Sequence, residues 1–299
     1  MRRRKTKISA RFFICALYFI SLFFFLSSIN AAPDAKVIQS RAKEYMNVYL
    51  KTGKFSGSIL IAQKGQVLLS EGYGMANYEL DVANTAKTIF RIGSVTKQFT
   101  ATAIMQLQEK GLLNVDDPLK KYIADYPNGE KITLHHLLTH TSGIVNVSSV
   151  PEHQQNLILP TPLEKVILSF KGLPLEFTPG EKFKYCNSGY HLLGYIIEKV
   201  SGKSYGDFLE ENIFQPLQMR NSGFDRNSLV LKNRASGYTH DNNVLTNAPY
   251  VNVAVTFAAG ALYSTVEDLY LWDRALYTEK ILKKISLDKM FTPFKGGYG

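Results

Sequence analysis

The stretch Arg91-Ile92-Gly93-Ser94-Val95-Thr96-Lys97 marks the point where the periodicity of the chain changes. After Lys97, apolar residues recur at helical intervals, at Phe99, Ala103, Ile104 and Leu107, and Gly111 then offers a stop. This pattern predicts a buried helix whose entrance carries Ser94 and Lys97, three residues apart on one face.

Ser94 and Lys97 have an obvious chemical use if they meet. A serine hydroxyl is a weak nucleophile until a base removes its proton, and a lysine whose pKa is lowered by burial is such a base. The positive end of a helix also favours negative charge at the serine oxygen. The spacing alone proves little, because Ser-x-x-Lys also describes an N-cap serine beside a solvated lysine.

Composition excludes nucleic acid as the expected partner. The net charge is +10, but six of the cations stand before residue 33 with no acid among them, which leaves +4 for the remainder. That remainder lacks the basic stripe that phosphate binding needs. With 299 residues and 45% hydrophobic content, the chain is long enough for a large core.

The first 32 residues are typical of an export signal. A basic start is followed by an apolar run from Phe12 to Leu26, about 15 residues and short for a membrane span, and then by small residues up to Ala32. We expect a periplasmic or secreted protein, with an uncleaved leader as the one route to a membrane. Of the two cysteines only Cys186 lies beyond the leader, so no internal disulfide is expected.

Several elements are predicted from pattern alone. Residues 35–50 suit an amphipathic helix, and residues 55–62 and 67–73 are strands that form a hairpin. From residue 91 onward the signals are mainly helical. They include a short helix that starts over residues 134–138 and ends at Ser142-Gly143, and a longer one that ends at Gly202. Thr265 and Asp268 are typical of a helix N-terminus.

Two motifs are set aside. Gly72-Tyr73-Gly74 lacks the third glycine and the following helix of a dinucleotide loop. His136 and His140 have metal-ligand spacing, but Leu137 stands where a zinc peptidase needs its glutamate and no third ligand is evident. Packing and loop hydrogen bonds are the favoured roles of these histidines.

Tyr185 and Asn187 stand one residue apart at the entrance of the helix that ends at Gly202. Both side chains can project into one cavity there. A tyrosine beside a lysine can relay protons, and an asparagine can hold the lysine and bind a substrate amide. A core tyrosine with a capping asparagine remains the alternative.

The order of these pieces resembles the serine β-lactamase and penicillin-binding protein family, in its class C β-lactamase-like branch of D-Ala-D-Ala carboxypeptidases, D-aminopeptidases and esterases. The likeness covers nearly everything from Phe55 onward. Five blocks carry it, namely residues 90–97, 111–118, 132–143 and 177–181, and Tyr185-Cys186-Asn187. Five blocks in the family's order are far more specific than any one of them.

The resemblance implies an α/β (α+β) fold of the β-lactamase/transpeptidase type: an antiparallel sheet flanked by terminal helices, plus an all-helical lobe. After the signal peptide (1–32) we expect one hydrolase domain (33–299), with a sheet lobe (33–90), a mainly helical lobe (91–255) and a return towards the sheet lobe (256–299). It implies Ser94 as the acylated nucleophile, Lys97 and Tyr185 sharing its proton, and Asn187 positioning the substrate. The backbone N–H of Ser94 is expected to form half of an oxyanion hole. No metal or organic cofactor is expected.

One departure concerns the end of the chain. The family's third motif, Lys- or His-x-Gly on a strand, follows a stretch like Gly296-Gly297-Tyr298-Gly299, where this sequence stops. That strand normally supplies the second oxyanion donor, and losing one donor costs on the order of a hundredfold in rate. We therefore expect the C-terminal strands to be missing from a truncated product or fragment with weak or absent activity.

The expected function is acyl transfer by a serine hydrolase on amide or ester bonds, of the D-Ala-D-Ala peptidase or esterase-like type. The substrate would be a small molecule or peptide: a D-Ala-D-Ala-like peptide, an ester or a β-lactam. Two alternatives stay open, a class C-type β-lactamase and a non-catalytic relative that binds peptidoglycan peptides or a partner. A third hypothesis, a membrane-anchored structural protein, depends only on the leader.

Overall fold

The computed structural model describes residues 35–298 apart from residues 54, 156 and 243. The predicted signal peptide lies outside these residues. In the part of the chain that is described, no helix combines the length and hydropathy needed to cross a membrane.

The regular elements are short and alternate along the chain. The helices are α2 (Ala35–Lys51), α3 (Thr96–Glu109), α4 (Leu134–Leu138), α5 (Pro151–Gln155), α6 (Leu163–Lys171), α7 (Asn187–Ser201), α8 (Tyr205–Leu209), α9 (Gln215–Leu217), α10 (Phe257–Gly260), α11 (Val266–Ala275) and α12 (Lys284–Phe291). Tighter or wider turns are η1 (Gly93–Val95), η2 (Leu119–Lys121), η3 (Val147–Ser149), η4 (Glu210–Phe214) and η5 (Val253–Thr256). The strands are β1 (Gly57–Gln63), β2 (Gln66–Tyr73), β3 (Met75–Asn77), β4 (Val82–Ala83), β5 (Phe90–Arg91), β6 (Gly223–Phe224), β7 (Tyr238–Asp241), β8 (Val244–Asn247) and β9 (Leu262–Ser264).

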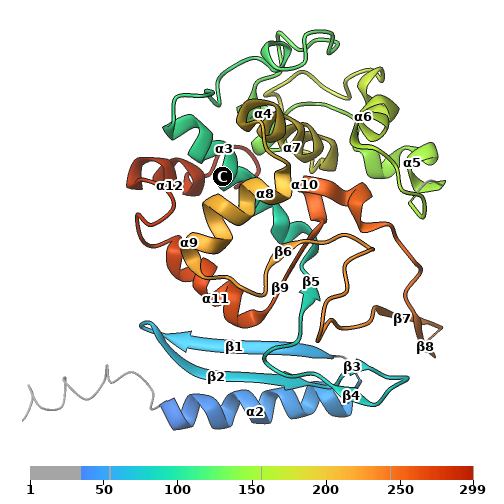
Figure 1. The fold of residues 1–299 in the computed structure, drawn as a ribbon, viewed down its shortest axis with the longest axis vertical. Helices are drawn as coiled ribbons and strands as arrows, with labels where there is room; N and C mark the ends of the chain where they lie inside the picture. The colour runs from blue at the N-terminus through green and yellow to red at the C-terminus, as the bar shows by residue number, and fades with distance from the viewer. Residues whose placement is uncertain (1–34, 54, 156, 243, 299) are drawn as a thin grey trace, which may run out of the picture.

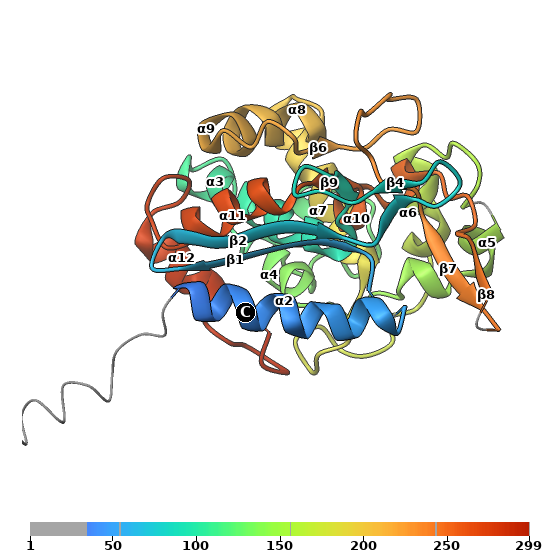
Figure 2. The same ribbon diagram turned by 90° about the horizontal axis from the view of Figure 1, so that it is seen from below.

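A layer of strands separates α2 from the remaining helices (Figure 1). The β1–β2 hairpin is antiparallel, as predicted, and turns at Lys64 and Gly65, both with positive φ. Helix α2 packs on β2, and α11 packs against β1. Seen from below, α2 runs along the hairpin (Figure 2). The Tyr270 hydroxyl of α11 donates to the Gly65 carbonyl at the hairpin turn (2.7 Å). The division into a sheet lobe, a helical lobe and a returning segment stays a prediction.

The region from 91 to 255, predicted to be mainly helical, also contains short strands. It contains β6 and the β7–β8 hairpin, and β6 joins β5 and β9 in a three-stranded antiparallel sheet of order β5-β9-β6. These strands are only two to four residues long, so they carry no alternation that a sequence pattern reveals. The sheet matters because it leads the chain directly from Arg91 into the turn that carries Ser94.

The largest core lies between α3 and α7 and the helices around them. Phe99 of α3 is fully buried and stacks on Trp272 of α11, with ring centroids 4.1 Å apart. Helix α7 buries its predicted apolar face and ends at Gly202, whose φ of 70° suits a helix C-terminus. Each fully buried side chain of this size contributes roughly 1.5–3 kcal/mol, which anchors α3 and α7.

Two distant loops are bonded side by side. The backbone N–H groups of Glu176, Gly180 and Lys184 donate to the carbonyls of Gly143, Thr141 and His140, at 2.7, 2.8 and 2.9 Å. Gly143 has φ of +74°, and a Cβ there would lie 2.1 Å from the Phe177 carbonyl oxygen. The pairing of the two loops therefore depends on glycine at position 143. The segment that follows Lys184 then lies beside the start of α3.

We expect Gly143→Ala to destabilise the fold by a few kcal/mol, because the left-handed backbone is strained for alanine and the Cβ displaces a backbone carbonyl. Gly111→Ala is the matched control: its φ is +69°, but a Cβ there meets open space. The control should lose only about 1 kcal/mol. Urea unfolding measures both, and equal losses would show that the loop contact contributes nothing.

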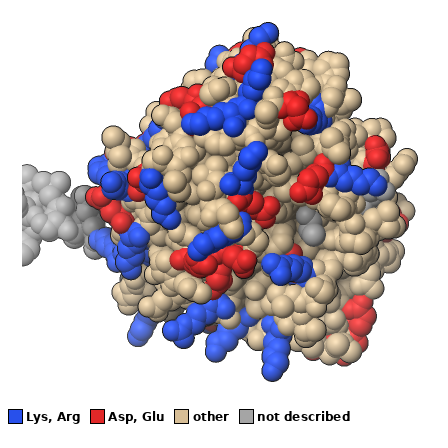
Figure 3. All heavy atoms as spheres, turned by 45° about the horizontal axis from the view of Figure 1, so that its top comes forward, with Lys and Arg blue, Asp and Glu red and all other residues tan. Residues whose placement is uncertain are grey.

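The described surface has mixed charge. Lysine and arginine side chains are interspersed with acidic ones over the centre of the face in Figure 3. Ion pairs on the described surface include Lys121–Asp117 and Lys284–Asp288, in each of which the two residues are four apart. The centre of this face is therefore mixed in sign, whereas Lys and Arg side chains predominate along its lower edge in Figure 3.

Candidate active site

Ser94 lies in η1, immediately before α3, as the sequence predicts. Gly93 adopts φ of 51° and lets the chain turn sharply out of β5. The Ile92 N–H donates to the Leu262 carbonyl (3.0 Å), and the Leu262 N–H donates to Thr96 Oγ1 (3.2 Å). These bonds fasten both sides of the turn to β9, so the Ser94 side chain is held exposed at the helix entrance.

Three reactive side chains converge at Ser94. Its Oγ lies 2.7 Å from the Tyr185 hydroxyl and 3.1 Å from Lys97 Nζ. Either hydroxyl of the first pair can be the donor. The structure therefore brings together the three predicted catalytic residues from separate parts of the chain.

Lys97 is 3% exposed although it carries an ionisable amine. Burial lowers its pKa to about 8. The Nζ also donates to the Ala259 carbonyl (2.7 Å) of α10 and lies 4.9 Å from the centroid of the Tyr185 ring. Because a neutral amine is accessible near neutral pH, Lys97 can accept the proton of Ser94.

The imidazole ring of His140 packs against the ring of Tyr185. Their ring centroids are 4.5 Å apart, and His140 Nδ1 accepts the N–H of Cys186 (3.1 Å). His136 instead caps α4, where its Nδ1 accepts the Thr133 N–H (3.2 Å). The predicted packing and loop roles of both histidines are confirmed by these bonds. Cys186 is buried and its thiol donates to the Ile144 carbonyl (3.3 Å).

Asn187 begins α7 but does not hold the lysine. Its Nδ2 donates to Ser148 Oγ (2.9 Å), and its backbone N–H donates to Asn146 Oδ1 (3.1 Å). The sequence-based idea that this amide holds Lys97 is therefore wrong for the described structure, because the Ala259 carbonyl takes that place. A role of Asn187 in substrate binding stays a prediction.

Ser94 and Asn187 line one cavity of about 540 Å³. Its other walls come from η3 and α5 on one side, and from η5 and α10 on the other. His191 also lines the cavity. Its Nδ1 lies 2.9 Å from the Asn187 carbonyl oxygen and its Nε2 lies 2.9 Å from the Val255 carbonyl oxygen. This side chain ties α7 to the segment that also supplies the Ala259 carbonyl.

The sequence profile of the Beta-lactamase family matches residues 38–298. The chain belongs to the beta-lactamase family. Its members include serine hydrolases, and the mixed α/β fold with antiparallel strands agrees with the beta-lactamase/transpeptidase type.

Three relatives illustrate where this beta-lactamase family member stands. A Bacillus subtilis protein named as a penicillin-binding protein, PbpX, is 37% identical over 82% of this chain and 61% of its own. A teichoic acid D-alanine hydrolase of Staphylococcus aureus is 27% identical over 86% and 62%. The solved structure of an octameric penicillin-binding protein homologue from Pyrococcus abyssi superposes with a TM-score of 0.76, at 36% identity over 85% of this chain and 60% of that one. The chain thus spans about three fifths of these relatives.

Sequence reasoning missed the Ala259 carbonyl in this beta-lactamase-like site. A backbone oxygen leaves no residue-type signal, so nothing in the sequence marks it as the partner of Lys97. His191 has no partner pattern in the sequence, and its partners are backbone carbonyls too.

The buried His140 predicts acid sensitivity. Burial lowers its pKa to about 4, and the Lys97 charge adds to the effect. An unfolded histidine has a pKa near 6.5, so between those values the unfolded chain binds the proton and the folded one does not. The free energy of unfolding should therefore fall by up to about 3 kcal/mol as pH drops from 6.5 to 4.

Urea unfolding at a series of pH values measures this effect. His140→Asn is the matched variant, because asparagine tolerates the left-handed backbone at φ of 56° and can accept the Cys186 N–H. This variant should show a flatter dependence on pH. A slope as steep as that of the wild type would assign the acid sensitivity to other groups.

Proposed function

We propose that the protein is a serine hydrolase that cleaves amide or ester bonds through an acyl-enzyme on Ser94. The contact of Ser94 Oγ with both the Tyr185 hydroxyl and Lys97 Nζ, at the wall of a substrate-sized cavity, carries this proposal. Membership of a family that includes serine hydrolases supports it.

The first step is the attack of Ser94 Oγ on the acyl carbon of the substrate. The Ser94 proton passes to the Lys97 amine, directly or through the Tyr185 hydroxyl, and a new C–O bond forms. The same groups return the proton to the leaving amine or alcohol as its bond to the acyl carbon breaks. The Ser94 N–H stands among the first-turn donors that a helix leaves unused, where it stabilises the oxyanion.

The second step is hydrolysis of the ester on Ser94. Water gives up a proton to the Lys97–Tyr185 pair as its oxygen bonds to the acyl carbon. The bond between the acyl carbon and Ser94 Oγ then breaks, the pair returns the proton to Ser94 Oγ, and the acid is released. Asn187 is proposed to orient the acyl part of the substrate in the cavity that it shares with Ser94.

We infer that the acyl donor is a D-alanyl amide or ester. The hydrolase from Staphylococcus aureus, which is similar over most of this chain, is named for D-alanine on teichoic acid. A D-Ala-D-Ala-like peptide has the same acyl chemistry. The export signal expected at residues 1–32 would place the protein where such cell-wall compounds occur, in the periplasm or outside the cell.

Intact-protein mass spectrometry tests the proposal. The purified chain is mixed with benzylpenicillin, or with a D-alanyl ester, and its mass is followed over time. A penicillin adduct that forms and persists, together with turnover of the D-alanyl ester, supports the proposal. An adduct that forms and clears quickly favours the class C-type β-lactamase. The absence of any adduct with either compound favours the non-catalytic binder.

The same experiment measures the rate. The expectation of weak or absent activity in this 299-residue chain stays a prediction. Hydrolysis of the ester at ordinary enzyme rates, about 1 per second or faster, would contradict it.

A further inference from the structure

A second cavity, of about 640 Å³, opens beside the strand that leads to Ser94. Among the residues that line it are Arg91 of β5, Arg234, Ser236 and Asn247. None of the described lining residues is acidic, and the walls also contain apolar groups such as Phe90 and Val251. A cavity with this lining suits a ligand that carries negative charge on part of its surface.

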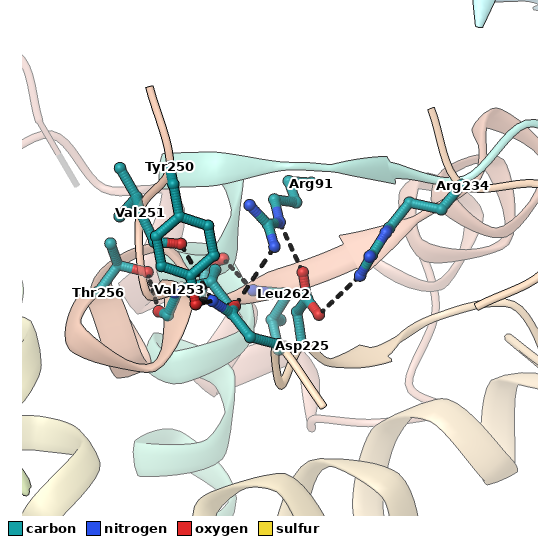
Figure 4. A network of polar contacts seen from close by, with 10 residues as sticks. Arg91, Asp225, Arg234, Tyr250, Val251, Val253, Thr256 and Leu262 are labelled. Atoms are coloured by element: carbon teal, nitrogen blue, oxygen red, sulfur yellow. Dashed lines mark hydrogen bonds and ion pairs between the residues drawn. The ribbon is translucent and has the colours of Figure 1, made fainter. Parts of the chain in front are cut away.

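The two arginines meet over one buried carboxylate (Figure 4). Asp225 is fully buried, directly after β6; its Oδ2 lies 2.6 Å from Arg91 Nε and its Oδ1 3.5 Å from Arg234 Nη1. One arginine is enough to neutralise one carboxylate. The second leaves a surplus of one positive charge at the cavity.

Both guanidinium groups keep donors that face away from Asp225. Their side chains remain 42% and 30% exposed, for Arg91 and Arg234 respectively. Each guanidinium has five N–H groups in a planar fork. Within the described residues, the side-chain bonds use two of them on Arg91 and one on Arg234. Such forks match the paired oxygens of a carboxylate or a phosphate.

The site is rigidly built rather than formed by chance on the surface. The amide of Asn227 accepts from Arg91 Nη2 (3.4 Å) and from the Val253 N–H (3.2 Å), and it also donates to Tyr250 and to the Val251 carbonyl. On the other side, Ile89 forms a parallel bridge with Arg234. Both arginines are therefore positioned before any ligand arrives, which lowers the entropic cost of binding.

We propose that this cavity binds an anionic group, a carboxylate or a phosphate, between Arg91 and Arg234. It is a site separate from Ser94, and its existence does not depend on the proposed hydrolase function. The two cavities are nevertheless neighbours along the chain: Phe90 and Arg91 line one while Gly93 and Ser94 line the other, and the segment from Pro249 to Gly260 borders both.

Isothermal titration calorimetry tests the site with two probes, inorganic phosphate and acetate, at constant ionic strength. Saturable binding of either probe is expected, and the tighter one identifies the ligand as a phosphoester or a carboxylate. Arg234→Gln should weaken binding at least tenfold, while Asp225 keeps Arg91 as its partner. Arg226→Gln removes an exposed charge next to Asp225 but outside the cavity lining, and it should bind as the wild type does.

A second variant tests the cavity without changing either arginine, in case Arg234→Gln does not fold. Ser236 accepts a hydrogen bond from Asn77 (2.9 Å), so Ser236→Asp keeps an acceptor there and places a carboxylate in the cavity. It should abolish anion binding, whereas Ser236→Asn should retain it. The titrations are repeated in Ser94→Ala, so that the result is independent of hydrolysis. The proposal would be overturned if the wild type bound neither phosphate nor acetate saturably. Equal weakening of binding in Arg234→Gln and Arg226→Gln would also overturn it.

Discussion

Ser94→Ala is expected to form no covalent adduct with benzylpenicillin and to lower whatever ester hydrolysis the wild type shows to the rate of the buffer. The reason is that Ser94 Oγ is the atom in contact with both Lys97 Nζ and the Tyr185 hydroxyl. Alanine removes the nucleophile and leaves the two proton carriers without a proton to move. Intact-protein mass and a spectrophotometric ester assay measure the two effects.

Ser148→Ala is the matched control for this variant. Ser148 lines the same cavity, but its Oγ accepts from Asn187 and has no bond to Lys97. The adduct should still form, with a modest change in KM from the altered position of Asn187. An adduct that survives in Ser94→Ala and disappears in Ser148→Ala would make Ser148 the nucleophile instead of Ser94.

Lys97→Arg is expected to slow acylation by roughly 10²–10⁴-fold. An arginine keeps its proton at any pH at which the protein is folded, so it cannot accept the hydrogen of Ser94. The native amine, by contrast, has a pKa of about 8 because it is buried. The acylation rate of the wild type should therefore rise with pH through about 8 and then level off, and the Arg variant should lack this rise.

The free energy of unfolding should also rise with pH because of Lys97. The folded pKa of Lys97 lies below its unfolded value near 10.4, so between about 8 and 10.4 the unfolded chain binds more protons. Stability from this site is therefore gained as pH rises through that window. Lys97→Met, which has a similar length and no charge, should lose this gain. For the kinetic prediction, an acylation rate of the wild type that does not change from pH 6 to 9 would rule out Lys97 as the base.

Local patterns predicted the elements that surround the site. The α3 periodicity, the glycine that ends α7 and the Thr265 cap, in which its Oγ1 accepts the Asp268 N–H at 3.1 Å, are all present. Such features depend on residues three or four apart, and the sequence displays that spacing directly. The short strands β5, β6 and β9 were not predicted, because their pairing joins residues far apart in the chain.

The sequence by itself determined the candidates for the proposed chemistry: a serine and a lysine one helical turn apart, and a tyrosine and an asparagine at the start of another helix. Only the tertiary structure decided their contacts. It placed Tyr185 at 2.7 Å from Ser94, gave the Ala259 carbonyl rather than Asn187 to Lys97, and paired Arg91 and Arg234 over Asp225. The reason is that burial and backbone partners, which set pKa values and charge balance, arise from packing between segments and leave no trace in local residue order.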